Sequence, residues 1–451
     1  MELYLTHHSG IRNLAKEAVK QLVSLDTTRD ELTVHLERAF LVSVALPERP
    51  WVGSDPLEEL RGLATTAGAT VVGGLCQRRL KVNPKSYIGK GKLEELQAQA
   101  EANDAEVVIF DNDLSPGQIR NLEKATKVKV LDRSELILDI FATRARSMEA
   151  RLQVELAQLE YALPRLRQMW THLGRAAGGI GTRGPGETQL EEDRRLVDAR
   201  IRDLKTRLVE VQARKEREVR SRREEHTVSL VGYTNAGKST LMNALTGAGV
   251  YVEDKLFSTL DTRTRKWHIK DWGRVLLSDT VGFIRDLPHH LVASFKATLE
   301  EARQARLLLH VVDASNEQAE DQIKSVNAVL KELGCGDKST LLVLNKVDRV
   351  SEPSFVQVLQ SKHPRSVAVS GATRVGLVEL QEAVMEMLSA DFANALIETD
   401  AGNGKVLSYL AAHAEIYRQE FRDNGVAVYC YLPRQLLHHI QGPTVNVRFL
   451  P

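Results

Sequence analysis

The stretch from Gly232 to Ser239 constrains the fold of this chain more than any other feature. It fits the phosphate-binding pattern G-x-x-x-x-G-K-[ST], in which two glycines let backbone N–H groups point inward at phosphate oxygens. Residues 227–231 alternate like a strand and residues 239–245 resemble a helix, so the loop has the context that it needs. The N-terminus of that helix adds partial positive charge. We therefore expect Lys238 to reach the β- and γ-phosphates of a nucleotide, and the Ser239 hydroxyl to bind Mg²⁺.

Three further matches follow downstream in the right order, which makes a chance match of the loop negligible, and two of them complete a phosphate and metal site. Asp279 follows the strand-like run 274–278 and should hold Mg²⁺ through water, while the N–H of Gly282 should meet the γ-phosphate. Between the loop and Asp279 lies a segment placed where switch I belongs, and its Thr259 should offer a second hydroxyl to Mg²⁺. The predicted contacts in these two segments are Phe257, Ser258, Thr259, Leu260, Asp261, Asp279, Thr280, Val281 and Gly282.

A third segment indicates that the base is guanine. The carboxylate of Asp348 can accept hydrogen bonds from the N1–H and the exocyclic amino group of guanine, a donor pair that adenine lacks. A buried carboxylate left unpaired by ATP costs about 1–3 kcal/mol. Asn345 should tie this segment to the phosphate loop, and the loop after the last strand should support the base edge. The predicted residues here are Asn345, Lys346, Val347, Asp348, Ser370, Gly371 and Ala372. GTP and GDP are the expected ligands.

Phe283 follows Gly282, at the position where many signalling GTPases carry a glutamine that orients the attacking water. Phenylalanine cannot do this, so GTP hydrolysis by the chain alone should be slow. Asn235 resembles the asparagine that binds K⁺ in a group of GTPases without that glutamine. The alternative is that Asn235 only forms hydrogen bonds within the phosphate loop. The predicted phosphate-loop contacts are Gly232, Tyr233, Thr234, Asn235, Ala236, Gly237, Lys238 and Ser239, and the predicted catalytic residues are Lys238, Thr259, Gly282 and Asn235.

The 451 residues suggest about three domains. Residues 39–46, 69–73, 105–110 and 127–131 have strand patterns, and residues 56–67, 92–102 and 115–125 have helical ones. This alternation predicts a small parallel α/β domain. Residues 88–92 resemble a phosphate loop without its full spacing, and we interpret them as a helix entry, or else a basic turn that could meet RNA.

A helical hairpin is predicted next. Residues 136–163 form an amphipathic stretch that we expect to end near Pro164, and residues 187–225 form a second long helix rich in charge. Between them, residues 161–186 contain four arginines and no acidic residue: Arg165, Arg167, Arg175 and Arg183. A basic, glycine-rich tip on a long arm suits insertion into folded RNA, and a solvated loop is the alternative.

Composition excludes several classes. No apolar run reaches 18 residues, and the first residues lack the regions of a signal peptide, so we expect no membrane span and peripheral membrane association at most. The three cysteines, Cys76, Cys335 and Cys430, suit neither a zinc site nor a disulfide framework and are interpreted as packing residues of a cytoplasmic protein.

Six segments together resemble the HflX-type GTPases of the translation-factor class: residues 87–92, 114–122, 131–133 with 136–142, 152–159, 178–190 and 232–239. The resemblance implies a Ras-like doubly wound G domain and a protein that binds the large ribosomal subunit and splits stalled ribosomes, notably under stress. It also implies that the hairpin tip reaches the peptidyl-transferase region and that the ribosome stimulates GTP hydrolysis.

We therefore expect five segments: an extension (1–38), an α/β subdomain (39–143), a helical hairpin (144–225), a G domain (226–392) and a small α+β domain (393–451). The expected cofactors are Mg²⁺ and, through Asn235, K⁺; the expected partner is the large subunit with its rRNA and not DNA, and the chain should be a monomer. The alternatives are a large-subunit assembly GTPase, an ATP-driven RNA remodelling enzyme and a membrane-associated regulator of proteolysis.

Overall fold

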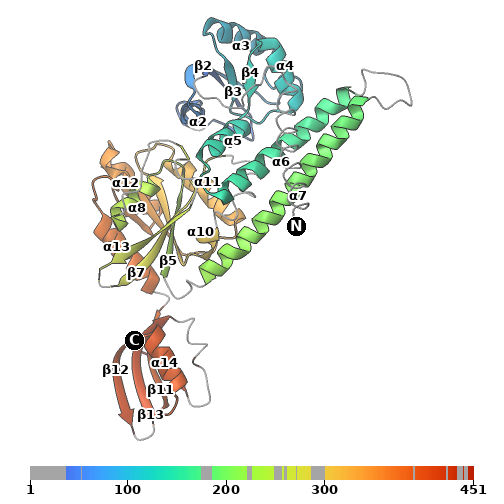
Figure 1. Ribbon diagram of the computed structural model, residues 1–451. Helices are drawn as coiled ribbons and strands as arrows, with labels where there is room; N and C mark the ends of the chain where they lie inside the picture. Colours follow the sequence, from blue (N-terminus) through green and yellow to red (C-terminus); the bar gives the residue numbers. More distant parts are fainter. Residues whose placement is uncertain are drawn as a thin grey trace.

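The computed structural model describes the chain from Glu37 onward with internal gaps. It covers residues 37–51, 53–173, 185–220, 226–247, 256–257, 262–270, 272–285, 300–389, 392–422, 425–433, 440 and 445–450. Three β-sheets follow one another along the chain, and two long helices leave the molecule as an arm between the first sheet and the second (Figure 1).

The first sheet is wholly parallel, as predicted, in the order β2-β1-β3-β4. Its strands are β1 (Arg38–Ala45), β2 (Thr70–Arg78), β3 (Val107–Phe110) and β4 (Lys129–Leu131). The continuous apolar run of β1 is buried because helices cover both faces of the sheet. One face packs on α2 (Glu58–Ala67) and α5 (Arg133–Arg144), and the other on α3 (Lys90–Ala102) and α4 (Pro116–Thr126).

The stretch predicted as one helix over 136–163 is in fact two helices, so this prediction was wrong. Helix α5 ends at Arg144, and α6 (Met148–Leu173) begins after a short break at which the Ser147 hydroxyl accepts a hydrogen bond from the N–H of Ala150 (3.1 Å). The predicted end near Pro164 is also wrong, because Pro164 lies inside α6. Apolar packing of Leu159 and Leu163 against the next helix outweighs the one hydrogen bond that proline cannot donate.

The arm consists of α6 and α7 (Pro185–Arg220), which lie side by side (Figure 1). Leucine and β-branched side chains spaced three and four apart fill their seam: Leu152, Leu156, Leu159 and Leu163 on α6, and Val197, Ile201, Leu204 and Leu208 on α7. Two ion pairs, Arg200 with Glu155 (2.7 Å) and Lys205 with Glu160 (2.8 Å), join the helices beside this seam. At 1.5 Å per residue the helices are roughly 40 and 54 Å long.

The second sheet is doubly wound, as predicted, in the order β10-β9-β8-β5-β7-β6. Its strands are β5 (His226–Gly232), β6 (Arg263–Ile269), β7 (Gly273–Asp279), β8 (Leu307–Asp313), β9 (Thr340–Asn345) and β10 (Ser366–Ala368). One face packs on α8 (Lys238–Thr246) and α13 (Leu377–Ser389). The other packs on α10 (Glu300–Gln304), α11 (Ala319–Glu332) and α12 (Pro353–Lys362).

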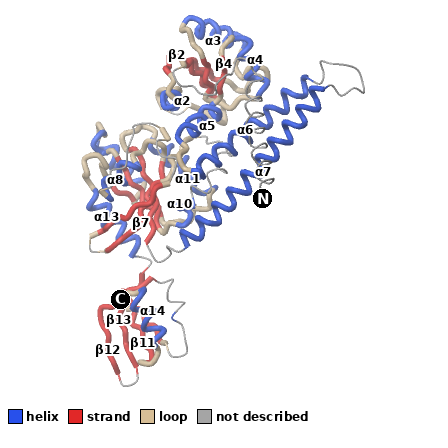
Figure 2. The backbone as a smooth tube through the Cα atoms, viewed as in Figure 1, coloured by secondary structure: helices blue, strands red, loops and turns tan. Residues whose placement is uncertain are grey.

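The third sheet is antiparallel, in the order β12-β13-β11-β14, and confirms the predicted α+β character of the C-terminal part (Figure 2). Its strands are β11 (Phe392–Asp400), β12 (Glu415–Arg422), β13 (Gly425–Pro433) and β14 (Asn446–Phe449). Helix α14 (Gly404–His413) packs through Leu410 on one face. In the part of the chain that the structure describes, no helix is both long enough and apolar enough to cross a membrane.

Candidate nucleotide-binding site

The phosphate-loop glycines stand where no side chain fits. Gly232 has φ +151°, and a Cβ there would lie 2.1 Å from the carbonyl oxygen of Val311 on β8. Gly237 has φ +90°, and a Cβ there would lie 2.3 Å from the Asn345 side-chain nitrogen. Residues 232–237 therefore turn tightly between the end of β5 and the start of α8, as the sequence pattern predicts.

Lys238 and Ser239 open α8 and are buried. The Lys238 amine donates to the carbonyl oxygens of Gly232 (3.1 Å) and Tyr233 (2.8 Å), so it folds over the loop. Burial lowers the pKa of Lys238 to about 8, although the negative charge of Asp279 opposes this shift. The Ser239 hydroxyl donates to Asp279 (2.6 Å), which brings the two predicted metal-side groups together.

Asn345 ties three loops together. Its amide nitrogen donates to the carbonyl oxygen of Ala236 (2.9 Å), and its side-chain oxygen accepts from the N–H of Gly371 (2.9 Å). The predicted link between the base segment and the phosphate loop is therefore present in the structure. The exposed Asp348 follows on the short turn η1 (Val347–Arg349).

The segment after β7 pairs with the phosphate loop. The Thr234 N–H donates to the Phe283 carbonyl (2.6 Å), and the Phe283 N–H donates to the Gly232 carbonyl (3.1 Å). A Cβ on Gly282 would lie 2.6 Å from Thr234 Cα and 3.1 Å from the Lys238 amine. Gly282 thus lies beside the amine expected to meet the γ-phosphate, and Phe283 is buried.

Of the predicted switch I residues, Phe257 lies within the described chain, whereas Ser258, Thr259, Leu260 and Asp261 lie outside it. The Phe257 N–H donates to the Thr234 hydroxyl (2.7 Å). Its buried ring meets that of Phe141 on α5 edge-on, with ring centroids 4.7 Å apart. Phe257 therefore connects the phosphate loop to the N-terminal α/β part.

Three family models match the chain in order. They describe a "GTP-binding GTPase N-terminal" region (residues 54–142), a "GTP-binding GTPase Middle Region" (144–223) and a "50S ribosome-binding GTPase" (227–346). The GTPase HflX of Caldanaerobacter subterraneus is 44% identical over 88% of this chain and 92% of its own length. The GTPase HflX of Escherichia coli is 45% identical over 82% of this chain and 88% of its own length.

The chain belongs to the HflX family of GTPases. The family resemblance and the enzyme class expected from the sequence, a GTP phosphohydrolase, are confirmed. Among solved structures, that of SsGBP in complex with GDP is 26% identical, with a TM-score of 0.45, and covers 78% of this chain and 99% of that one.

Sequence reasoning missed several residues of this HflX-family site. Asp313, at the end of β8, pairs with the amine of Lys346 (2.7 Å). Glu59 and Arg133 come from the N-terminal α/β part and contact Tyr233 and the backbone of Arg285, respectively. An aspartate that ends a buried strand is a signal that could have revealed Asp313. No local pattern marks Glu59, because its partners lie 74 and 174 residues away.

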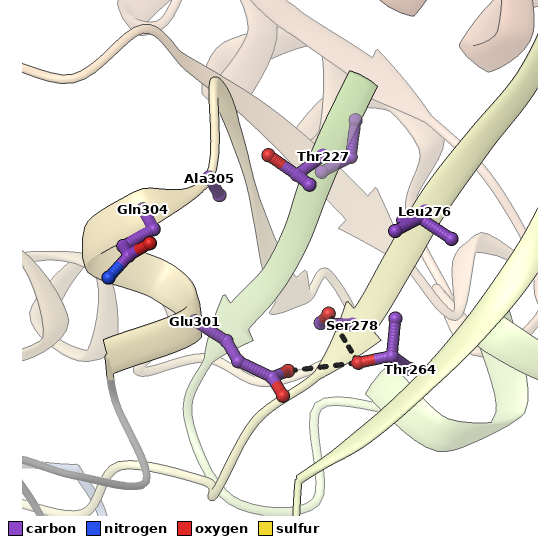
Figure 3. Close-up of a pocket in the computed structure, with 8 residues that line it drawn as sticks. Thr227, Thr264, Leu276, Ser278, Glu301, Gln304 and Ala305 are labelled. Atoms are coloured by element: carbon purple, nitrogen blue, oxygen red, sulfur yellow. Dashed lines mark hydrogen bonds between the residues drawn. The ribbon is translucent and has the colours of Figure 1, made fainter. Parts of the chain in front are cut away.

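A separate small pocket lies on the α10 face of the second sheet (Figure 3). The Thr264 hydroxyl lies 3.0 Å from that of Ser278 and donates to Glu301 (3.2 Å), so these polar groups pair with one another. The pocket shares no residue with the phosphate loop. It is lined by Thr227, Val228, Thr264, Leu276, Ser278, Glu301, Gln304 and Ala305.

Proposed function

We propose that this GTPase binds the large ribosomal subunit and separates stalled or idle ribosomes into subunits, notably under stress. The observation that carries the proposal is the α6–α7 arm, whose distal end projects away from both α/β parts (Figure 1). Along the sequence, the connection between the two helices lies within residues 161–186, which contain four arginines and no acidic residue. The description "50S ribosome-binding GTPase", printed for the family model that matches residues 227–346, supports the same partner.

The predicted contacts are proposed as the nucleotide site, with the phosphates on residues 232–239 and the guanine on Asp348. The Ser239 hydroxyl and the Asp279 carboxylate are buried oxygen donors that lie 2.6 Å apart, and oxygen is the ligand type that Mg²⁺ prefers. These two groups fit the ion, with Ser239 as a proposed direct ligand and Asp279 acting through water. Thr259, which lies outside the described residues, is proposed as the second direct ligand from the sequence alone. When bound, Mg²⁺ neutralises charge on the phosphate oxygens.

The monovalent-cation role of Asn235 is part of this proposal. Asn235 stands in the left-handed region (φ 61°) on the exposed outer side of the phosphate loop, a conformation that asparagine tolerates. Phe283 cannot orient the attacking water, so the site needs another source of catalysis. A K⁺ ion held by Asn235 would neutralise charge on the phosphates, as an arginine finger does in other GTPases.

Replacing Na⁺ with K⁺ should therefore raise the rate of GTP hydrolysis, and Asn235→Ala should remove the difference while GTP still binds. The rates are measured in matched chloride buffers at constant ionic strength. Equal rates in Na⁺ and K⁺ for the unmodified chain would leave Asn235 with a role in loop structure alone.

The arm supplies the proposed RNA contact. Its leucine seam, from Leu152 to Leu163 on α6, and its two interhelical ion pairs hold the two helices together over the half of the arm nearer the α/β parts. Tyr161 on α6 donates a hydrogen bond to Asp132 (2.6 Å), which anchors the arm to the N-terminal α/β part. Arginines at such a tip suit phosphate groups of folded RNA.

Cosedimentation tests the proposed partner. The chain is mixed with mature large subunits or with subunit precursors, in the presence of a non-hydrolysable GTP analogue or GDP, and pelleted through sucrose. We expect pelleting with mature subunits in the analogue and much less in GDP. Pelleting only with precursors would instead indicate an assembly GTPase, and no pelleting with either would contradict the proposal.

A further inference from the structure

A cluster of ionic and phenolic side chains joins the N-terminal α/β part to the nucleotide site. We call it the interdomain cluster and define it as Glu59, Asp111, Arg133, Tyr233 and the backbone of Arg285. Three members come from the N-terminal part, one from the phosphate loop and one from the segment after Phe283. It thus connects elements that are far apart in the sequence.

The hydrogen bonds of the cluster form a closed path. Arg133 donates to Asp111 (2.6 Å), to Glu59 and to the carbonyl oxygen of Arg285 (2.9 Å). The Tyr233 hydroxyl donates to the other oxygen of Glu59 (2.5 Å) and accepts from the N–H of Arg285 (2.8 Å). Both the N–H and the carbonyl of Arg285 are therefore hydrogen-bonded. Tyr233 of the phosphate loop holds the N–H, and Arg133 of the N-terminal part holds the carbonyl.

Charge and burial make these bonds specific. Arg133 is 1% exposed and Tyr233 7% exposed, so each relies on its partners in place of water. Burial would raise the pKa of Glu59, but the positive charges of Arg133 and Arg285 outweigh burial and lower it. Burial and the charge of Glu59 raise the pKa of Tyr233 well above its usual value, so its hydroxyl keeps the proton that it donates.

The held backbone directly follows Gly282, the residue expected to meet the γ-phosphate. Arg285 is three residues beyond Gly282, and Phe283 between them is paired with the phosphate loop through two backbone hydrogen bonds. On the switch I side, the N–H of Leu256 donates to the Thr66 hydroxyl on α2 (3.2 Å), next to the contact of Phe257 with Phe141. The N-terminal part thus touches the described beginnings of both segments expected to meet the γ-phosphate.

We propose that Glu59 and Arg133 are positioning residues for GTP hydrolysis, because through Tyr233 and the Arg285 backbone they hold residues 282–285 in register with the phosphate loop. In this register Gly282 lies beside Thr234 and the Lys238 amine, where its N–H is expected to meet the γ-phosphate. GDP lacks that phosphate, so its affinity does not depend on the cluster. The inference rests on the GTPase activity alone and is independent of the ribosome proposal.

The test uses the full chain without ribosomes and the variants Glu59→Gln and Tyr233→Phe. Each removes one charge or one hydroxyl and keeps the side-chain size. We expect each to lower kcat by roughly tenfold, and to lower affinity for a non-hydrolysable GTP analogue more than affinity for GDP, which should stay within about twofold. The double variant should be little worse than either single one, since both act through one contact.

Glu58→Gln is the matched control, because Glu58 is the exposed neighbour of Glu59 on α2, and among the described residues its side chain makes one long contact, with Gln318 (3.5 Å). It should leave kcat and both affinities unchanged. Arg133 itself is not replaced, since its loss would leave Glu59 and Asp111 buried without their cation. Unchanged or raised kcat in both variants would overturn the proposal. A parallel fall of kcat, GDP affinity and thermal stability would also overturn it, because it would indicate a structural role only.

Discussion

At the residue scale, Lys238 combines a fixed position in the phosphate-loop motif with an unusual environment. Its amine is buried, folds onto the carbonyl oxygens of Gly232 and Tyr233, and has a pKa lowered to about 8. Phosphate groups favour the charged amine, so nucleotide binding should restore the proton that burial disfavours. The lysine therefore links nucleotide affinity to pH.

We predict that GDP binding at pH 8 takes up about half a proton, since about half of the buried amines are neutral at that pH before binding. Calorimetry in two buffers with different ionisation enthalpies measures this uptake. The uptake should shrink towards pH 7, where the amine is already charged. Binding at pH 8 that proceeds without proton uptake would show that the Lys238 amine is fully charged in the free chain.

The phosphate-loop residues, Asp279 and Asn345 could be predicted from the sequence because each belongs to a short motif with fixed spacing. The bonds of Asn345 to Ala236 and to Gly371 agree with its predicted role. Glu59 and Arg133 could not be predicted, because long-range packing of α2 and α5 against the phosphate loop brings them there. A sequence motif reflects contacts within one segment of the chain. The contacts of Glu59 and Arg133 instead join segments that only the fold brings together.

At the element scale, the central parallel strands were predictable from their apolar runs, which burial on both faces requires: β1, β3, β5, β8 and β9. Strand β6 was missed, since only Trp267 and Ile269 of its seven residues are buried. It pairs antiparallel with β7 at the edge of the sheet, where its other side chains reach solvent. An edge strand with so few buried residues leaves a weak alternating pattern.

The break between α5 and α6 was hidden by an apolar pattern that continues across it. Both helices contribute to one apolar cluster, α5 through Ile137 and Phe141 and α6 through Val154 and Ala157. A helical period therefore persists although the chain changes direction. Pro164 had the opposite effect: it suggested a helix end where the helix continues. The hydrogen bond that proline cannot donate costs less free energy than loss of the leucine seam would.

At the scale of the whole molecule, one apolar cluster runs from the N-terminal α/β part into the second sheet. It includes Leu63 and Phe141 from the first part and Tyr233, Phe257 and Phe283 from the nucleotide site. Helix α6 of the arm packs on the same cluster with one face and on α7 with another. The arm and the nucleotide site are thus built on a shared core, which is the route we propose for coupling nucleotide state to ribosome contact.

The central claim is that the GTP-bound chain splits ribosomes through its arm, and sedimentation of intact ribosomes tests it most directly. Ribosomes are incubated with a non-hydrolysable GTP analogue or GDP and with either the unmodified chain or its Arg175→Ala, Arg183→Ala double variant, and the free subunits are resolved on a sucrose gradient. We predict free subunits with the unmodified chain in the analogue, few in GDP, and few with the variant although it still binds GTP. Intact ribosomes in every sample, or equal splitting by the variant, would contradict the account.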